Sequence, residues 1–127
     1  MRPRQYYLNL APVTKKNHQR IIWTGGHPRI AQSEQYLTYE ARCLLLLAPQ
    51  APRKPIGCAV NVQCLYYMPT RRKVDLTNLL AATDDILVRA GILEDDNSNI
   101  VVSHDGSRVL YDKTNPRTEI VITEAKQ

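Results

Sequence analysis

The segment from residue 75 to residue 91 constrains the fold more than any other part of the sequence. Asp75 stands where a helix N-cap is expected, and Gly91 stands where helices commonly end with a residue of positive φ. Between these two residues the positions expected to be buried recur every three or four residues, at Leu76, Leu79, Leu80, Thr83 and Leu87. The pattern predicts a helix from about residue 75 to residue 90 that packs one face against a sheet or another helix.

A second helix is predicted between Ser33, as its N-cap, and Pro49, which stops it. Its apolar positions recur at helical spacing and predict a buried stripe formed by Leu37, Ala41, Leu44, Leu45 and Ala48. The proline-rich segment 49–55 that follows is too short for a domain linker.

The remaining segments read as strands. Residues 56–68 alternate best, and shorter strands are predicted at 6–10, 99–105 and 117–124. Residues 20–33 read as a hairpin around Gly25-Gly26, which supply the positive φ of a two-residue turn. This order predicts the α+β class, a small mixed β-sheet with two main helices packed on one face, as a single domain over residues 1–127.

Charge is segregated along the chain, whose formal net charge is +5. No acidic residue precedes Glu34, and this region contains the basic residues Arg2, Arg4, Lys15, Lys16, Arg20 and Arg29. From residue 75 to residue 96 a single cation, Arg89, accompanies Asp75, Asp84, Asp85, Glu94, Asp95 and Asp96. A basic surface beside clustered carboxylates suits a metal-dependent nuclease, although solvated faces of unrelated proteins segregate charge in the same way.

The strongest candidate site combines Asp75 with Asp95 and Asp96, which flank the 75–90 helix. Clustered carboxylates bind Mg²⁺, a hard cation that also takes water and phosphate oxygens as ligands. Taken singly, Asp75 can be a helix cap and residues 93–97 an acidic turn. Asp84 and Asp85 lie in the middle of the helix. We expect one of the two carboxylates on a solvated face, while the other can turn toward the site.

A helix of this length separates its ends by about 20 Å. Residues 92–96 must therefore double back along the helix, or a partner subunit must complete the site.

Other classes of site fit less well. Cys43, Cys58 and Cys64 form no closely spaced pair, and the three histidines are scattered, which argues against structural zinc. We expect reduced thiols, no membrane span and no signal peptide, and hence a cytoplasmic protein.

The block MPTRRKVDLTNLLAATDDILVRAGILEDDNSNIV, residues 68–101, resembles the centre of the RusA family of Holliday junction resolvases, which are common in prophages. That family has a basic run, Asp-x-Asp-Asn-Leu at a helix start, a lysine on the helix, Asp-x-Leu, a glycine and an Asp-Asp pair before a strand. The positions that match with equal gaps are Arg71, Arg72, Lys73, Asp75, Asn78, Leu79, Asp85, Leu87, Gly91, Asp95 and Asp96. The resemblance extends over about residues 5–124 and implies a RusA-like fold.

The resemblance also assigns roles to individual residues. It implies that Asp75 and Asp96 bind a catalytic Mg²⁺, with Mn²⁺ as an alternative, and that Asp95 belongs to the catalytic group. Two positions depart from the family: Thr77 replaces its second Asp, and Ala81 replaces its helix lysine. Because Thr77 supplies no carboxylate, the coordination shell of the metal lacks one ligand, and Asp85 or water can take that place.

The function expected from this resemblance is a Mg²⁺-dependent endonuclease that resolves four-way and other branched DNA in recombination and repair. A homodimer suits the symmetry of a four-way junction. We expect phosphate contacts from Lys15, Lys16, Arg20, Arg71, Arg72 and Lys73. Thr77 and Ala81 motivate an alternative, a catalytically impaired protein that binds junctions without cutting them. A hydrolase of a small phosphate compound is a more distant alternative.

Overall fold

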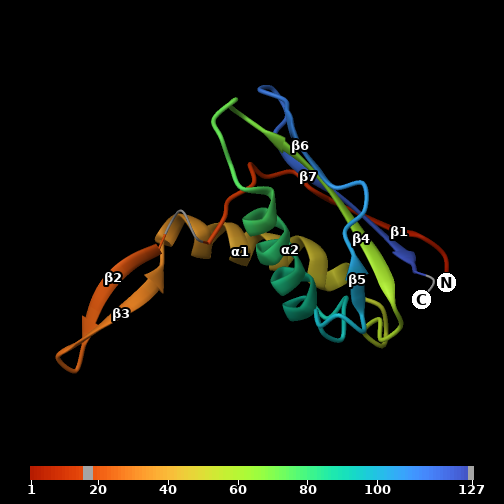
Figure 1. The fold of residues 1–127 in the computed structure, drawn as a ribbon, viewed down its shortest axis with the longest axis horizontal. Coiled ribbons are helices and arrows are strands. Elements are labelled where there is room, and N and C mark those ends of the chain that lie inside the picture. Colours follow the sequence, from red (N-terminus) through yellow and green to blue (C-terminus); the bar gives the residue numbers. More distant parts are fainter. Residues whose placement is uncertain (16–18, 126–127) are drawn as a thin grey trace.

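The computed structural model describes residues 1–15 and 19–125 of the chain (Figure 1). The elements follow in the order β1 (Arg4–Leu8), β2 (Gln19–Thr24), β3 (His27–Gln32), α1 (Glu34–Leu47), the 3₁₀ turn η2 (Ala48–Gln50), β4 (Val60–Met68), α2 (Leu76–Arg89), β5 (Val101–Ser103), β6 (Arg108–Tyr111) and β7 (Arg117–Glu124).

The main sheet is mixed and is built around β4. Strand β7 pairs antiparallel with both β4 and β1. The other edge of β4 is shared by two short parallel strands, because β5 pairs at Val60 and Asn61 and β6 pairs from Leu65 to Met68. The predicted mixed sheet is confirmed. Strand β6 lies between the strands predicted at 99–105 and 117–124, where no strand was predicted.

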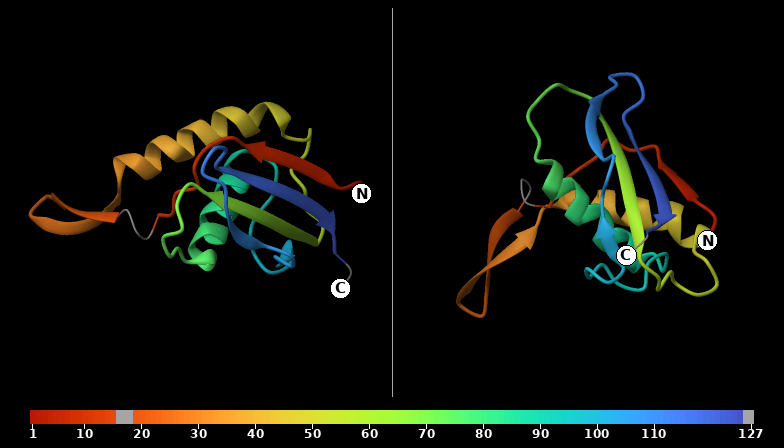
Figure 2. Two further views of the ribbon diagram at one scale, coloured as in Figure 1. Left: turned by 90° about the horizontal axis from the view of Figure 1, so that it is seen from above. Right: turned by 45° about the vertical axis from the view of Figure 1, so that its right-hand side comes forward.

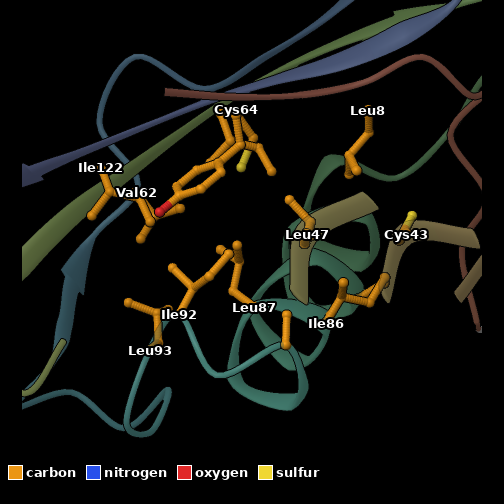
Figure 3. Close-up of a cluster of buried hydrophobic side chains, with 14 of the residues drawn as sticks. Leu8, Cys43, Leu47, Val62, Cys64, Ile86, Leu87, Ile92, Leu93 and Ile122 are labelled. Carbon is orange, nitrogen blue, oxygen red and sulfur yellow. The ribbon is translucent and has the colours of Figure 1, made fainter. Parts of the chain in front are cut away.

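Both helices pack on one face of this sheet (Figure 3). Alternate residues of β4 (Val62 and Cys64 among them) and Ile122 of β7 point into the core, where they meet Leu47 of α1 and Leu87 of α2. The opposite face of β4 is only partly buried. The α+β class, with a small mixed sheet and two main helices on one face, is confirmed.

Helix α2 begins and ends as its sequence predicts. Asp75 is the N-cap, and its Oδ1 accepts a hydrogen bond from the Thr77 backbone N–H at 2.9 Å. At the other end Gly91 has a φ of +79°. The chain then pairs with Ile56, whose backbone N–H donates to the Ile92 carbonyl and whose carbonyl accepts from the Glu94 N–H. Residues 92–94 are thereby held beside the segment that leads into β4.

Helix α1 has the predicted N-cap, since Ser33 Oγ accepts from the Tyr36 N–H at 3.1 Å. Its predicted buried stripe was wrong. The residues of α1 that are buried are Tyr36, Tyr39, Glu40, Cys43 and Leu47. Leu45 is instead 77% exposed. Four consecutive leucines place an apolar residue on every side of this helix, so its spacing alone does not define which side meets the sheet.

Strands β2 and β3 form a separate two-stranded sheet that projects from the rest of the molecule beyond the start of α1 (Figures 1 and 2). Gly25 and Gly26 have φ values of 60° and 77°. The predicted hairpin turn is therefore confirmed.

Within residues 1–15 and 19–125, neither helix has the length and apolar character that a membrane span requires.

Candidate active site

The N-terminal end of α2 joins a carboxylate to a basic loop. Asp75 is exposed, and it follows three exposed cationic residues, Arg71, Arg72 and Lys73. The Arg71 guanidinium lies 4.1 Å from the centroid of the Tyr111 ring in β6, a cation–π contact that positions it. This end of α2 can bind a phosphate backbone beside the Asp75 carboxylate.

The two carboxylates beyond the C-terminal end of α2 differ in their surroundings. Asp95 accepts from the Asp96 backbone N–H at 2.7 Å and from the Asn97 side chain at 3.0 Å, and these bonds hold the pKa of Asp95 below its usual value. The pKa of Asp96 is raised by desolvation, by a hydrogen bond with Asp95 and by the nearby negative charge of Asp84. A cation near Asp96 would therefore relieve unfavourable electrostatics.

Asp84 and His104 form a pair that was not predicted from the sequence. Asp84 is only 7% exposed, and its Oδ1 and Oδ2 lie 3.0 and 2.8 Å from His104 Nε2. The pKa of His104 is raised, chiefly by this hydrogen bond. One signal was available, because Asp84 lies four residues after Leu80 and three before Leu87, which is the buried spacing of α2. No local signal links it to a histidine 20 residues away.

Asp85 belongs to a separate ion-pair network. Its Oδ2 lies 2.7 Å from Lys15 Nζ and 3.5 Å from Arg89 Nε, and Arg89 also binds Glu40 at 2.9 Å. Asp85 is thus paired with cations, whereas Asp84 is the mid-helix carboxylate whose negative charge contributes to the raised pKa of Asp96. Because residues four apart share a helix face, Lys15 lies on the face of α2 that carries Ala81.

The candidate carboxylates separate into two groups. Helix α2 lies between Asp75 and the segment 92–99, which are at its opposite ends (Figures 1 and 2). Its 14 residues span roughly 20 Å. Accordingly, the described part of a single chain contains no group of three or more His, Cys, Asp or Glu side chains able to hold a metal.

The other expected phosphate contacts come from the segment before and within β2. Lys15 is half-buried in its ion pair with Asp85. Lys16 lies outside the described residues, and Arg20 is described only through its backbone in β2.

The site residues are the basic loop with Asp75 at one end of α2, and Asp95 with Asp96 beyond its other end. On a small α+β scaffold, these are the elements of a phosphodiester-cleaving nuclease. The family model described as Endodeoxyribonuclease RusA matches residues 9–123, and the chain belongs to the RusA family. The crossover junction endodeoxyribonuclease RusA of Aquifex aeolicus (strain VF5) is similar to it, with 30% identity over 93 residues that cover 73% of this chain and 71% of that protein. The resemblance found in the 68–101 block is confirmed.

Proposed function

We propose that this protein is a Mg²⁺-dependent endonuclease that resolves four-way and other branched DNA during recombination and repair, acting as a homodimer. The observation that carries the proposal is the family match over residues 9–123, which contains Asp75, Asp95 and Asp96 and the basic loop before α2. The name of the relative from Aquifex aeolicus supports crossover junctions as the substrate class.

In this proposal Asp75 and Asp96 hold the metal, with Mn²⁺ as an alternative to Mg²⁺, and Asp95 supports them. Carboxylate oxygens are the ligands that hard divalent cations prefer, and the raised pKa of Asp96 is consistent with a carboxylate that gains from a cation. Bound Mg²⁺ would polarise the phosphoryl group and lower the pKa of the attacking water. Asp95 holds the Asp96 backbone through its hydrogen bond to that N–H.

The separation of the carboxylates supports a site built from two protomers. In a twofold dimer, Asp75 of one protomer meets Asp96 of its partner only if the two α2 helices run antiparallel with the axis near the middle of the helix. Ala81 lies near this midpoint and is exposed, and its small side chain permits close approach of two helices. Such a dimer has two equivalent sites, which suits paired nicks in a four-way junction.

The DNA is held through its phosphates. Arg71, Arg72 and Lys73 are exposed beside Asp75, so they can bind the backbone next to the scissile phosphate. Lys15, Lys16 and Arg20, which the sequence places shortly before β2 and at its start, are proposed as further phosphate contacts. For Lys15 this contact requires exchange of Asp85 for a phosphate.

Cleavage of a synthetic four-way junction across a Mg²⁺ titration tests the proposal. Wild-type protein is expected to nick two opposing strands symmetrically, and Asp75→Asn is expected to bind the junction without cutting it. Cleavage by Asp75→Asn at the wild-type rate, or an intact junction at every Mg²⁺ and Mn²⁺ concentration, would contradict it.

A second candidate is a junction-binding protein without nuclease activity, which Thr77 and Ala81 favour. Thr77 offers no carboxylate, and Ala81 offers no cation. One observation argues against this candidate. The ion pair with Asp85 places Lys15 Nζ on the same face of α2 as Ala81, so this face has a cation although Ala81 replaces the family's lysine. Tight, salt-sensitive junction binding with no metal-dependent nicking would identify the non-cleaving protein.

A further inference from the structure

The β2–β3 hairpin presents apolar side chains that the proposed metal site does not use. Every described side chain from residue 21 to residue 29 is exposed. The hairpin projects away from the main sheet, toward the end of the molecule opposite the two termini (Figures 1 and 2). The loop 69–74 lies toward this same end in both figures. Two-stranded hairpins are marginally stable in water, and exposed apolar patches mark interaction sites.

The two faces of the hairpin differ in chemistry. Side chains alternate along a strand and directly opposed residues share a face, so the register places Ile21, Trp23 and Pro28 together. Trp23 and Ile21 are 73% and 69% exposed. The opposite face carries Ile22 and Arg29, which are paired across the strands. One face is therefore apolar and aromatic, and the other is partly cationic.

Charge selects the kind of partner. The first 33 residues contain six Lys or Arg residues and no Asp or Glu, and a chain of net charge +5 favours a polyanion. A second copy of the chain would bring the same basic segment against this one. A nucleic acid instead offers phosphates for the cations and flat bases for an indole ring.

Within DNA, the apolar face fits a branch point better than a continuous duplex. Bases inside a duplex are covered on both sides by their neighbours, whereas base pairs at a branch expose a flat apolar surface. Aromatic side chains stack on such bases, and apolar side chains act as wedges between base steps. We propose that the face formed by Ile21, Trp23 and Pro28 binds the branch point, with Trp23 stacked on an exposed base. This inference rests on the proposed function and names the part of the DNA that the hairpin contacts.

Trp23 is the single tryptophan of the chain, so its fluorescence reports directly on this contact. Wild-type protein is titrated with an immobile four-way junction and with a duplex of equal length and composition, with Ca²⁺ in place of Mg²⁺. The anisotropy of labelled DNA measures occupancy in parallel. We expect quenching and protection from acrylamide with the junction, and little change with the duplex at equal occupancy. An equal response to both DNAs, or no response to a bound junction, overturns the proposal.

Variants separate stacking from hairpin stability. Trp23→Ala is expected to weaken junction binding by about 5- to 100-fold, the range for loss of one stacked base, while duplex binding changes by less than about twofold. Trp23→Phe retains a ring and is expected to retain most of the preference for junctions. Ile22→Ala truncates an apolar side chain on the opposite face and is the matched control. Equal losses in Trp23→Ala and Ile22→Ala overturn the proposal.

Three further outcomes bear on this inference and on the proposed function. If Trp23→Ala binds and cuts junctions as well as the wild type, the hairpin contact is overturned while the proposed nuclease stands. If no junction is bound, both are overturned. If Trp23 becomes protected from acrylamide as the protein concentration rises in the absence of DNA, the hairpin is a contact between subunits. That result would overturn this inference and leave the proposed nuclease function standing.

Discussion

His104 Nε2 lies 2.8 Å from Asp84 Oδ2, and the negative charge of Asp84 also contributes to the raised pKa of Asp96. The pair joins the loop after β5 to the second half of α2, whose end leads into the segment 92–99. It therefore holds the second half of α2 against the loop after β5.

This pair predicts a pH dependence of stability. The pKa of His104 is raised above its ordinary value of 6.5, so the protonated pair contributes fully below that pH and its contribution is lost as pH rises through the folded pKa. We expect the free energy of unfolding by urea to fall from about pH 6 to about pH 8 in the wild type, and to fall less in His104→Gln. His27→Gln, in the exposed hairpin, is the control. Equal slopes in the wild type and His104→Gln would contradict the assignment.

Removal of the histidine side chain has a larger effect. His104→Ala leaves the Asp84 carboxylate, which is 7% exposed, without its imidazole partner, and we expect a loss of about 1–3 kcal/mol in unfolding free energy at pH 6. Urea denaturation measures this change. Asp84→Asn,His104→Ala removes the charge as well and is expected to recover part of the loss. A double variant no more stable than the single one would count against the buried pair.

Thr77→Asp introduces the carboxylate that the resemblance to the RusA family implies at this position. The position lies in the first turn of α2, where a negative charge is favoured by about 0.3–1 kcal/mol, so the fold tolerates it. We expect the Mg²⁺ concentration at half-maximal junction cleavage to fall by roughly tenfold, because ligand charge sets affinity for hard cations. Gln35→Glu makes the same charge change in the first turn of α1 and is the control. An unchanged Mg²⁺ midpoint in Thr77→Asp would exclude position 77 from the metal site.

Helix caps and periodicity were enough to predict much of α2. Asp75 and Gly91 carry local chemistry that defines its ends, and Asp84 sits at buried spacing. The buried face of α1 was not predictable in this way, since the leucines at 44–47 surround the helix and the sheet selects Cys43 and Leu47. Strand β6 was missed for a related reason. It is short and mostly exposed, and it exists because the edge of β4 is available beside it.

The sequence selects candidate site residues but does not predict how they are arranged. The motif spacing identified Asp75, Asp95 and Asp96, and the length of α2 already required a long separation between its ends. The contacts of Asp84 and Lys15 depend on where the loop after β5 and the segment before β2 pack, which no local pattern encodes.

Arg71→Ala tests whether the basic loop binds DNA phosphates. Loss of one phosphate contact is expected to weaken binding to junction and duplex alike, and to reduce the slope of log K against log salt concentration by about 1. Binding measured by anisotropy over a range of salt concentrations gives this slope. Arg53→Ala removes another exposed arginine from the connection between α1 and β4, far from the loop 69–74 in Figure 1, and should leave the slope unchanged. Equal slope changes in both variants would argue against a phosphate-binding site localised to the basic loop.

Ala81→Glu tests the proposed contact between two α2 helices. Ala81 is exposed in one chain, so the substitution should not affect the monomer fold, but it places like charges together near the twofold axis. We expect light scattering to detect monomers and junction cleavage to be lost. Ala41→Glu is the same change at an exposed alanine of α1 and should leave a dimer. Monomers formed by Ala41→Glu and a dimer retained by Ala81→Glu would place the interface over α1 instead.

The central claim is that two protomers build each metal site, and subunit complementation tests it most directly. Asp75→Asn and Asp96→Asn proteins are each expected to be inactive. When they are mixed and allowed to exchange subunits, a shared site predicts heterodimers with one intact site and one doubly substituted site. In an equal mixture about half of the dimers are heterodimers, and each has one intact site of two. The mixture should therefore nick junctions with about a quarter of the wild-type number of sites. If exchanged mixtures stay as inactive as either variant alone, both aspartates belong to the same protomer's site and the shared-site account is wrong.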